Sequence, residues 1–224
     1  MDSSNKNSGL VISYFMMRRI IGILGIGLPV IVVLGGFLQN GFVFRDSISS
    51  YYYTNMRDFF VGLLCCVGLF LMSHKGYEKI DNITGSISGI FALGIAFFPT
   101  YLTGSKIIDV GIFQLSDNVS AYFHLTFATL FFLSMAFISI FLFTRHGATK
   151  TKQKEKRNIV YITCGYVIIA SIVCMLVYDL FMQNTFITSV QPVLIFETIS
   201  LSAFGISWLV KGETLFADKD GVEE

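Results

Sequence analysis

Six apolar stretches alternate with short polar connections along nearly the whole chain of 224 residues. Counted with their interfacial residues, they are about 18 to 25 residues long, which matches the ~30 Å hydrocarbon core of a bilayer at ~1.5 Å of rise per helical residue. A globular core does not need six such stretches. The sequence therefore predicts an all-α, polytopic membrane protein. The predicted spans are Ile20–Leu38, Phe59–Ser73, Gly85–Leu102, Ala121–Thr144, Ile159–Met182 and Val190–Val210.

The composition leaves no room for a separate soluble domain. Hydrophobic residues make up 54% of the chain and charged residues 14%, which is far from the balance of a soluble protein. We predict one six-helix bundle at residues 20–210, between cytoplasmic tails at 1–19 and 211–224. A cleaved signal peptide is not expected, because the first apolar stretch is too long and no small-residue cleavage site follows it.

The basic residues fall mainly on one side of the predicted membrane. If the N-terminus is cytoplasmic, 13 of the 16 Lys and Arg residues lie in cytoplasmic segments, and the outer loops hold Arg45, Arg57 and Lys106. Membrane insertion leaves basic residues on the cytoplasmic side. The sequence therefore predicts that both termini are cytoplasmic, and we expect the protein in a bacterial plasma membrane.

A basic run at residues 150–157, reading KTKQKEKR, connects the fourth and fifth spans. Its simplest interpretation is a topological anchor, and the alternative is a patch that binds anionic lipid or a cytoplasmic partner. Because no aromatic residues alternate with these bases on a usable surface, nucleic-acid binding is not expected.

All four cysteines lie inside predicted spans, where thiols behave as small hydrophobic groups. The chain has no CxxC motif and no Cys/His spacing typical of metal ligands. We therefore expect no disulfide framework, no metal site and no cofactor.

Four ionisable residues lie at or just below the predicted outer surface. Asp58 opens the second span, His124 lies about one turn into the fourth, and Asp179 lies in the last turn of the fifth. Glu197 lies roughly 10 Å along the sixth span. An intramembrane carboxylate is costly, so Glu197 is the strongest functional candidate.

Aromatic and basic residues form a rim above these groups. Three consecutive tyrosines, Tyr51 to Tyr53, are typical of the aromatic belt at a membrane interface. The alternative is that Tyr52 and Tyr53, together with Arg57 and Asp58, contact a ligand. Asp58 also has a simple structural interpretation, in which it stabilises a helix N-terminus and pairs with Arg57. His124 also has a simple structural interpretation, as a hydrogen-bonded residue of the core.

The order of the spans and two short motifs resemble the DRAM/Frag-like membrane proteins and their uncharacterised bacterial relatives. The motifs are Asp46-Ser-Ile-Ser before an aromatic stretch, and His124-Leu-Thr-Phe-Ala-Thr-Leu-Phe-Phe132 in the fourth span. The resemblance implies a six-helix fold with both ends inside. It associates one branch with remodelling of GPI-anchor lipids and others with autophagy or lysosomal roles.

A more distant comparison is with the alkaline ceramidase and adiponectin-receptor superfamily, whose lipid hydrolases use several histidines to bind a metal. This chain departs from that pattern, since His74 and His146 fall on the predicted cytoplasmic side and His124 on the outer side. A three-histidine zinc site is therefore not expected.

Three functions remain open from the sequence. The first is binding of a lipid or amphipathic small molecule in an outward-facing pocket lined by Arg57, Asp58, His124, Asp179 and Glu197. The second is a lipid hydrolase or remodelling enzyme. In it His124 is the general base, Asp179 or Glu197 orients it, and water or a serine such as Ser49 or Ser50 is the nucleophile. The third is a non-enzymatic scaffold or sensor.

Overall fold

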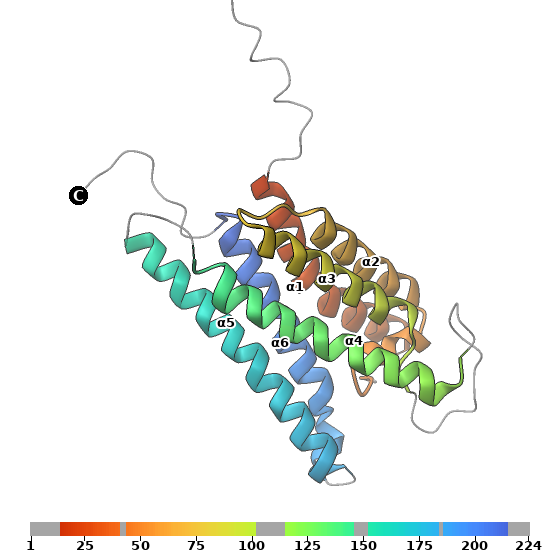
Figure 1. Cartoon of the computed structure of the whole chain (residues 1–224). Helices are drawn as coiled ribbons and strands as arrows, with labels where there is room; N and C mark the ends of the chain where they lie inside the picture. The colour runs from red at the N-terminus through yellow and green to blue at the C-terminus, as the bar shows by residue number, and fades with distance from the viewer. Residues whose placement is uncertain (1–13, 41–43, 102–114, 146–151, 184–185, 215–224) are drawn as a thin grey trace, which may run out of the picture.

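The structure is a computed structural model that describes residues 14–40, 44–101, 115–145, 152–183 and 186–214. These residues form helices joined by short connections, with no β-strand among them (Figure 1). Most residues of the predicted tails, and most of those between the predicted third and fourth spans, lie outside the described residues. The all-α prediction is confirmed.

The six long helices follow the predicted order but differ from the predicted spans at their ends. The third begins six residues before the predicted Gly85, because Glu78 and Asp81 form a capping box at its N-terminus. The long helices are α1 (Tyr14–Asn40), α2 (Arg57–Ser73), α3 (Lys79–Phe97), α4 (Asp117–Phe137), α5 (Lys152–Val177) and α6 (Pro192–Lys211). Short helical segments are η1 (Ser49–Tyr53), η2 (Ile138–Leu142), η3 (Tyr178–Met182) and η4 (Phe186–Val190).

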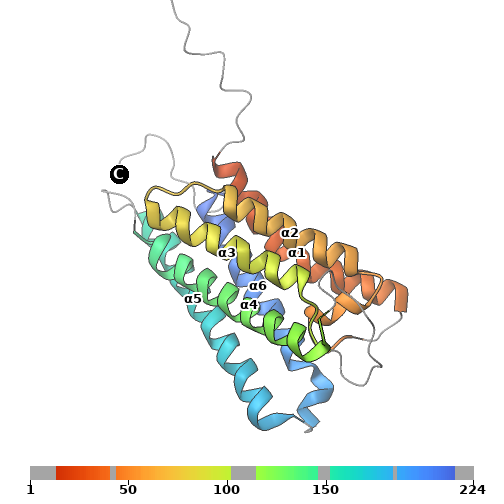
Figure 2. The ribbon, with the colours of Figure 1, turned by 45° about the vertical axis from the view of Figure 1, so that its right-hand side comes forward.

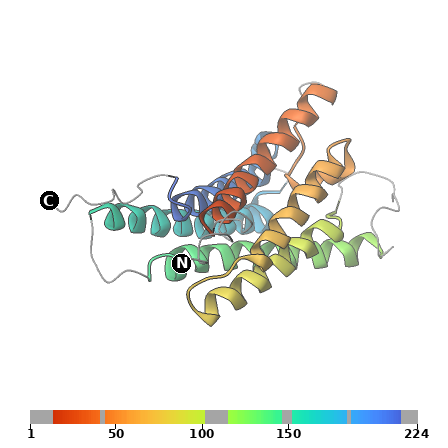
Figure 3. The same ribbon diagram turned by 90° about the horizontal axis from the view of Figure 1, so that it is seen from above.

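Each long helix packs against its neighbours in the sequence, and α6 packs against α1 to close the ring. Figures 2 and 3 show this arrangement from two further directions. Two glycines allow α1 and α6 to approach closely. A Cβ atom on Gly22 would lie 2.7 Å from the Gly205 carbonyl oxygen, so a larger residue would force the two helices apart.

Five of these helices are long and apolar enough to cross a membrane. They are the segments Tyr14–Leu38, Lys79–Phe97, Asn118–Leu142, Lys152–Met182 and Pro192–Lys211. The remaining helix, α2, has 17 residues, which is at the short end of the range of about 17 to 25 that a span needs. These five apolar helices indicate an integral membrane protein, while a sixth span at α2 stays a prediction.

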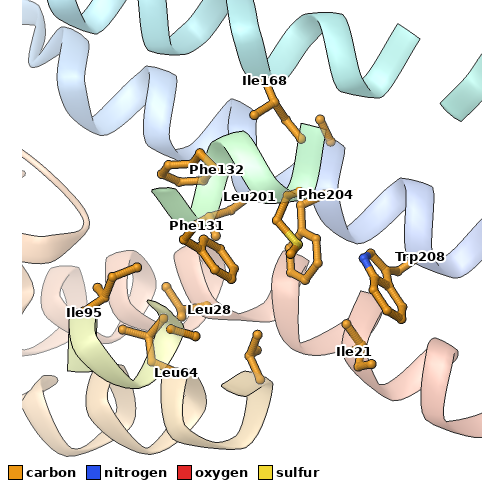
Figure 4. Close-up of a cluster of buried hydrophobic side chains, with 14 of the residues drawn as sticks. Ile21, Leu28, Leu64, Ile95, Phe131, Phe132, Ile168, Leu201, Phe204 and Trp208 are labelled. Atoms are coloured by element: carbon orange, nitrogen blue, oxygen red, sulfur yellow. The ribbon is translucent and has the colours of Figure 1, made fainter. Parts of the chain in front are cut away.

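Aromatic and branched side chains fill the centre of the ring (Figure 4). Phe131 of α4 packs against Phe204 of α6, with ring centroids 5.8 Å apart. Ile21 and Leu28 of α1 and Leu64 of α2 belong to the same buried cluster, and each is at most 4% exposed. Side chains from at least four of the six long helices therefore meet in this core.

A ring of aromatic contacts holds the end of the bundle where α2 meets α3. His74, directly after α2, stacks on Tyr14 with centroids 5.0 Å apart and meets Trp208 edge-on at 5.1 Å. The pKa of His74 is lowered from 6.5 to about 4, chiefly because the ring is buried, and the positive charges of Arg18 and Lys211 act in the same direction while Asp81 opposes them. His74 is therefore neutral in the folded protein near pH 7.

We predict that His74→Gln removes a pH-dependent part of the stability. In the unfolded chain His74 takes up a proton near pH 6.5, and in the folded protein only near pH 4, so the wild type loses stability as the pH falls through this window. The loss from this group is at most about 3 kcal/mol. Chemical unfolding in mild detergent at intervals between pH 4 and 7.5 should show the advantage of wild type over His74→Gln shrinking at low pH. A constant difference would contradict the prediction.

Candidate functional site

The segment between α1 and α2 folds back into the end of the bundle instead of lying over it. Ile48, Tyr51, Tyr52 and Met56 are between 1% and 5% exposed. A glycine near the end of α1 permits this, since a Cβ atom on Gly36 would lie 2.4 Å from Cε1 of Tyr51. The aromatic-belt interpretation is therefore wrong for Tyr51 and Tyr52, because both rings are buried inside the protein.

Glu197 of α6 fastens this segment to the bundle. Its Oε2 accepts a hydrogen bond from the backbone N–H of Ile48 at 2.5 Å. A second hydrogen bond joins the same two segments: the backbone N–H of Leu194 donates to the carbonyl oxygen of Asp46 at 3.1 Å. A carboxylate that accepts a buried backbone N–H satisfies a donor that no water reaches. Glu197, which the sequence marked as the strongest functional candidate, thus has a structural role in binding the Ile48 N–H.

His124 of α4 bridges the same segment to the end of α3. Its Nδ1 lies 2.6 Å from the carbonyl oxygen of Phe98, and its Nε2 lies 2.9 Å from Oγ of Ser49. A carbonyl oxygen can only accept, so Nδ1 carries the hydrogen and, in the neutral ring, Nε2 is an acceptor. The Ser49 hydroxyl therefore donates to Nε2 of a histidine that is 4% exposed.

Ser49 also lies next to Glu197, with 3.5 Å between Oγ and Oε1. A serine hydroxyl has one hydrogen, and the shorter distance to His124 favours the histidine as its acceptor. Residues from η1, α4 and α6 thus meet at one point. The hypothesis that a carboxylate orients His124 is not supported by this arrangement, because the Phe98 carbonyl occupies Nδ1 and Glu197 lies on the far side of Ser49.

An apolar hollow opens beside this point, and we call it the Ser49 hollow. Its empty volume is about 350 Å³, counted with the space at its mouth. Ser49 and Glu197 supply polar groups to its wall, and side chains from five of the long helices supply the apolar remainder. These are chiefly Leu28, Phe60, Leu64, Ile95, Phe131 and Leu201.

The predicted ligand contacts of α2 surround a different hollow, which we call the Arg57 hollow. It has an empty volume of about 800 Å³ and is lined by Tyr52, Arg57, Asp58, Val61, Gly62, Ala96 and Phe97. An Nη2 hydrogen of Arg57 bonds to the Tyr52 hydroxyl at 3.1 Å, and the guanidinium lies 4.7 Å from the centre of that ring. Asp58 is exposed. Within the described ranges no ion pair joins it to Arg57, so the predicted pairing is wrong.

The other two predicted site residues are not among the residues that line either hollow. Tyr53 donates a hydrogen bond from its hydroxyl to the carbonyl oxygen of Thr100 at 2.6 Å. Asp179 is exposed in η3 and accepts a hydrogen bond from the side-chain amide of Gln183. The single predicted pocket is therefore divided into one region around Ser49, His124 and Glu197, and another around Arg57 and Asp58.

Two features of the site could not be read from the sequence. The first is the hydrogen bond between His124 and the Phe98 carbonyl, because any residue has a backbone carbonyl and its partner cannot be inferred from the residue type. The pairing of Ser49 with His124 joins residues 75 positions apart. In the described part of the chain, no three His, Cys, Asp or Glu side chains lie close enough to hold a metal ion.

Comparison of the chain with protein-family models, curated proteins and solved structures gave no match. The resemblance to DRAM/Frag-like proteins therefore stays a prediction.

We predict that Glu197→Ala destabilises the fold by about 1 to 3 kcal/mol, because it leaves the buried N–H of Ile48 without an acceptor. Glu197→Gln keeps an acceptor oxygen and should lose less. Thr198→Ala is the matched control, since the Thr198 hydroxyl bonds to Leu194 within its own helix. Unfolding in detergent measures all three. Equal stabilities for Glu197→Ala and Thr198→Ala would show that the Ile48 contact contributes nothing.

Proposed function

We propose that this integral membrane protein resides in a bacterial plasma membrane with both termini cytoplasmic, and binds an amphipathic lipid in the Arg57 hollow. The observation that carries the binding proposal is the lining of this hollow. Charged Arg57 and Asp58 lie beside an apolar wall formed by Val61, Ala96 and Phe97. Such a combination suits a molecule with a polar headgroup and an apolar chain.

The two charged residues indicate the chemistry of the headgroup. Arg57 has five N–H donors, and Tyr52 takes one of them, so the remainder suit a phosphate. The Asp58 carboxylate is the next residue along and carries the opposite charge, which suits an ammonium group. A headgroup with both a phosphate and a primary amine, as in phosphatidylethanolamine, fits this pair.

Charge and helix geometry support the proposed orientation. Of the 16 Lys and Arg residues, 13 lie in the predicted cytoplasmic segments, and membrane proteins usually carry an excess of basic residues on that side. Nε of Arg19, near the start of α1, donates to the carbonyl oxygen of Gly212 just after α6, at 2.7 Å. The start of α1 therefore lies beside the end of α6. This is the arrangement expected when an even number of helices crosses the membrane and both termini lie on the same side.

Gly62 offers a test of lipid binding. A Cβ atom added there meets no atom within 4 Å, and Gly62 lines the hollow, so we expect the ring of Gly62→Phe to extend into this space. We expect this variant to retain phosphatidylethanolamine at least about tenfold less than wild type in native mass spectrometry, since the bulky ring takes the place of the lipid chain. Arg57→Gln should weaken binding in the same direction.

Gly27→Phe on α1 is the matched control, because a Cβ atom there meets only Ile31 of the same helix, at 3.8 Å. Phosphatidylcholine, which lacks the N–H donors of a primary amine, is the control lipid. Equal retention of phosphatidylethanolamine by wild type and both glycine variants would refute binding in this hollow.

The Ser49–His124 contact favours a second candidate function, an acyl-ester hydrolase. The 2.9 Å separation lies within the range of about 2.6 to 3.2 Å for a nucleophile and its general base. In such a reaction Oγ of Ser49 forms a bond to the ester carbon and its proton passes to Nε2 of His124. The histidine then protonates the departing alkoxide, and water hydrolyses the acyl-serine.

A fluorophosphonate probe and an ester substrate test this candidate. Wild type should label at Ser49 and hydrolyse a short-chain fluorogenic ester, and Ser49→Ala or His124→Ala should each reduce the rate by at least about a hundredfold. Ser50→Ala is the control, since its hydroxyl pairs with Ser47. Absence of labelling in wild type, or a Ser49→Ala rate equal to wild type, excludes the hydrolase and leaves the Arg57 hollow untouched.

A further inference from the structure

Basic side chains from three helices surround a hollow at the opposite end of the bundle, which we call the Arg18 hollow. Arg18 comes from α1, Lys154 and Arg157 from α5, and Lys211 from the end of α6. The empty volume is about 480 Å³, counted with the space at its mouth. Four basic residues thus line one concave surface on the predicted cytoplasmic side.

Arg18 is the most deeply placed of the four, with 3% of its surface exposed. Its Nη1 donates to the carbonyl oxygen of Lys211 at 3.2 Å, and its Nη2 contacts the Tyr14 hydroxyl. Its Nε has no hydrogen-bond partner, and no described carboxylate lies within 4.0 Å of the guanidinium. A buried cation with an unused donor is costly unless an anion compensates it.

Lys211 is a second cation with no carboxylate within 4.0 Å of it among the described residues. Its Nζ donates to the carbonyl oxygen of Phe143 at 3.0 Å and lies 5.3 Å and 5.6 Å from the ring centres of Phe143 and Tyr161. An ammonium has three donors, and the described residues provide no carboxylate for the others within 4.0 Å. Two neighbouring cations are thus held in place by neutral groups.

The carboxylates near these cations do not neutralise the hollow. Glu213 is the acidic residue in its lining. Asp81 faces an adjoining hollow that also touches Arg18, but its Oδ2 accepts the backbone N–H groups of Tyr77 and Glu78 at 2.9 and 3.1 Å. Among the described residues, the lining of the Arg18 hollow therefore holds one acidic side chain, Glu213, and four basic ones.

The basic run at 150–157 is divided by this arrangement. Lys154 and Arg157 lie one turn apart and line the hollow, whereas Lys152 and Lys156 are exposed and do not. A run of basic residues that served only as a topological anchor would not need to place two of them in a hollow. Arg guanidinium groups with a fixed fork of donors suit the oxygens of a phosphate, and lysine adds charge.

We propose that the Arg18 hollow binds a phosphate group, carried either by a soluble phosphate compound or by the headgroup of an anionic lipid of the same membrane leaflet. The phosphate oxygens would accept hydrogen bonds from Arg18 and Lys211 in the depth of the hollow and from Lys154 and Arg157 at its mouth. This site is independent of the Arg57 hollow, which lies at the other end of the bundle.

Purified full-length protein in nonionic detergent provides the test, with two probes. Pyrophosphate binding is measured by its saturable effect on the melting temperature at constant ionic strength. Phosphatidylglycerol retention over phosphatidylcholine is measured by native mass spectrometry. We expect at least one probe to bind, and Lys154→Gln/Arg157→Gln to weaken that binding at least about tenfold.

Lys152→Gln/Lys156→Gln is the matched control, since it removes the same charge from the same helix outside the hollow. Its binding should stay within about twofold of wild type. A response to pyrophosphate identifies a soluble phosphate ligand, and a response to phosphatidylglycerol alone identifies a lipid. No binding of either probe, or equal losses in the two double variants, overturns the proposal. If the double variant proves unstable, Arg157→Gln against Lys156→Gln repeats the comparison with single changes.

Discussion

The carboxylate of Glu197 holds the connection between α1 and α2 inside the bundle, and the candidate site depends on this contact. The bond to the Ile48 N–H ties the start of η1 to α6, next to the point where the Ser49 hydroxyl reaches His124 of α4. The same short helix carries the buried Tyr52, whose hydroxyl accepts a hydrogen bond from the guanidinium of Arg57. One hydrogen-bonded carboxylate thus positions the polar groups of both hollows at this end.

The two ends of the bundle satisfy their polar groups differently. At the end with Glu197, backbone and side-chain partners account for the hydrogen bonds of the carboxylate and of the imidazole of His124. At the end with Arg18 and Lys211, carbonyl oxygens and aromatic rings take the place of counter-ions. A bundle with a tight aromatic core between these ends keeps the two regions apart, so a ligand at one end does not need to affect the other.

The predicted site was partly recovered in three dimensions. His124 and Glu197 do approach one serine, as the sequence suggested for a catalytic group. Asp179 does not join them, because it lies exposed in η3, directly after α5, where it bonds to Gln183. Position along a helix axis can be estimated from residue number, but direction around the bundle depends on how the helices pack. That is why the predicted pocket divided into two.

The sequence by itself determined the helical class and the number of long helices, because these depend on local hydrophobicity. Only the tertiary structure decided that the connection carrying Ser49 and Tyr52 is buried. It also decided that a backbone carbonyl holds His124, and that Arg18 meets Lys211 across 193 positions. These contacts join segments remote in sequence, and their geometry follows from packing and not from local propensity.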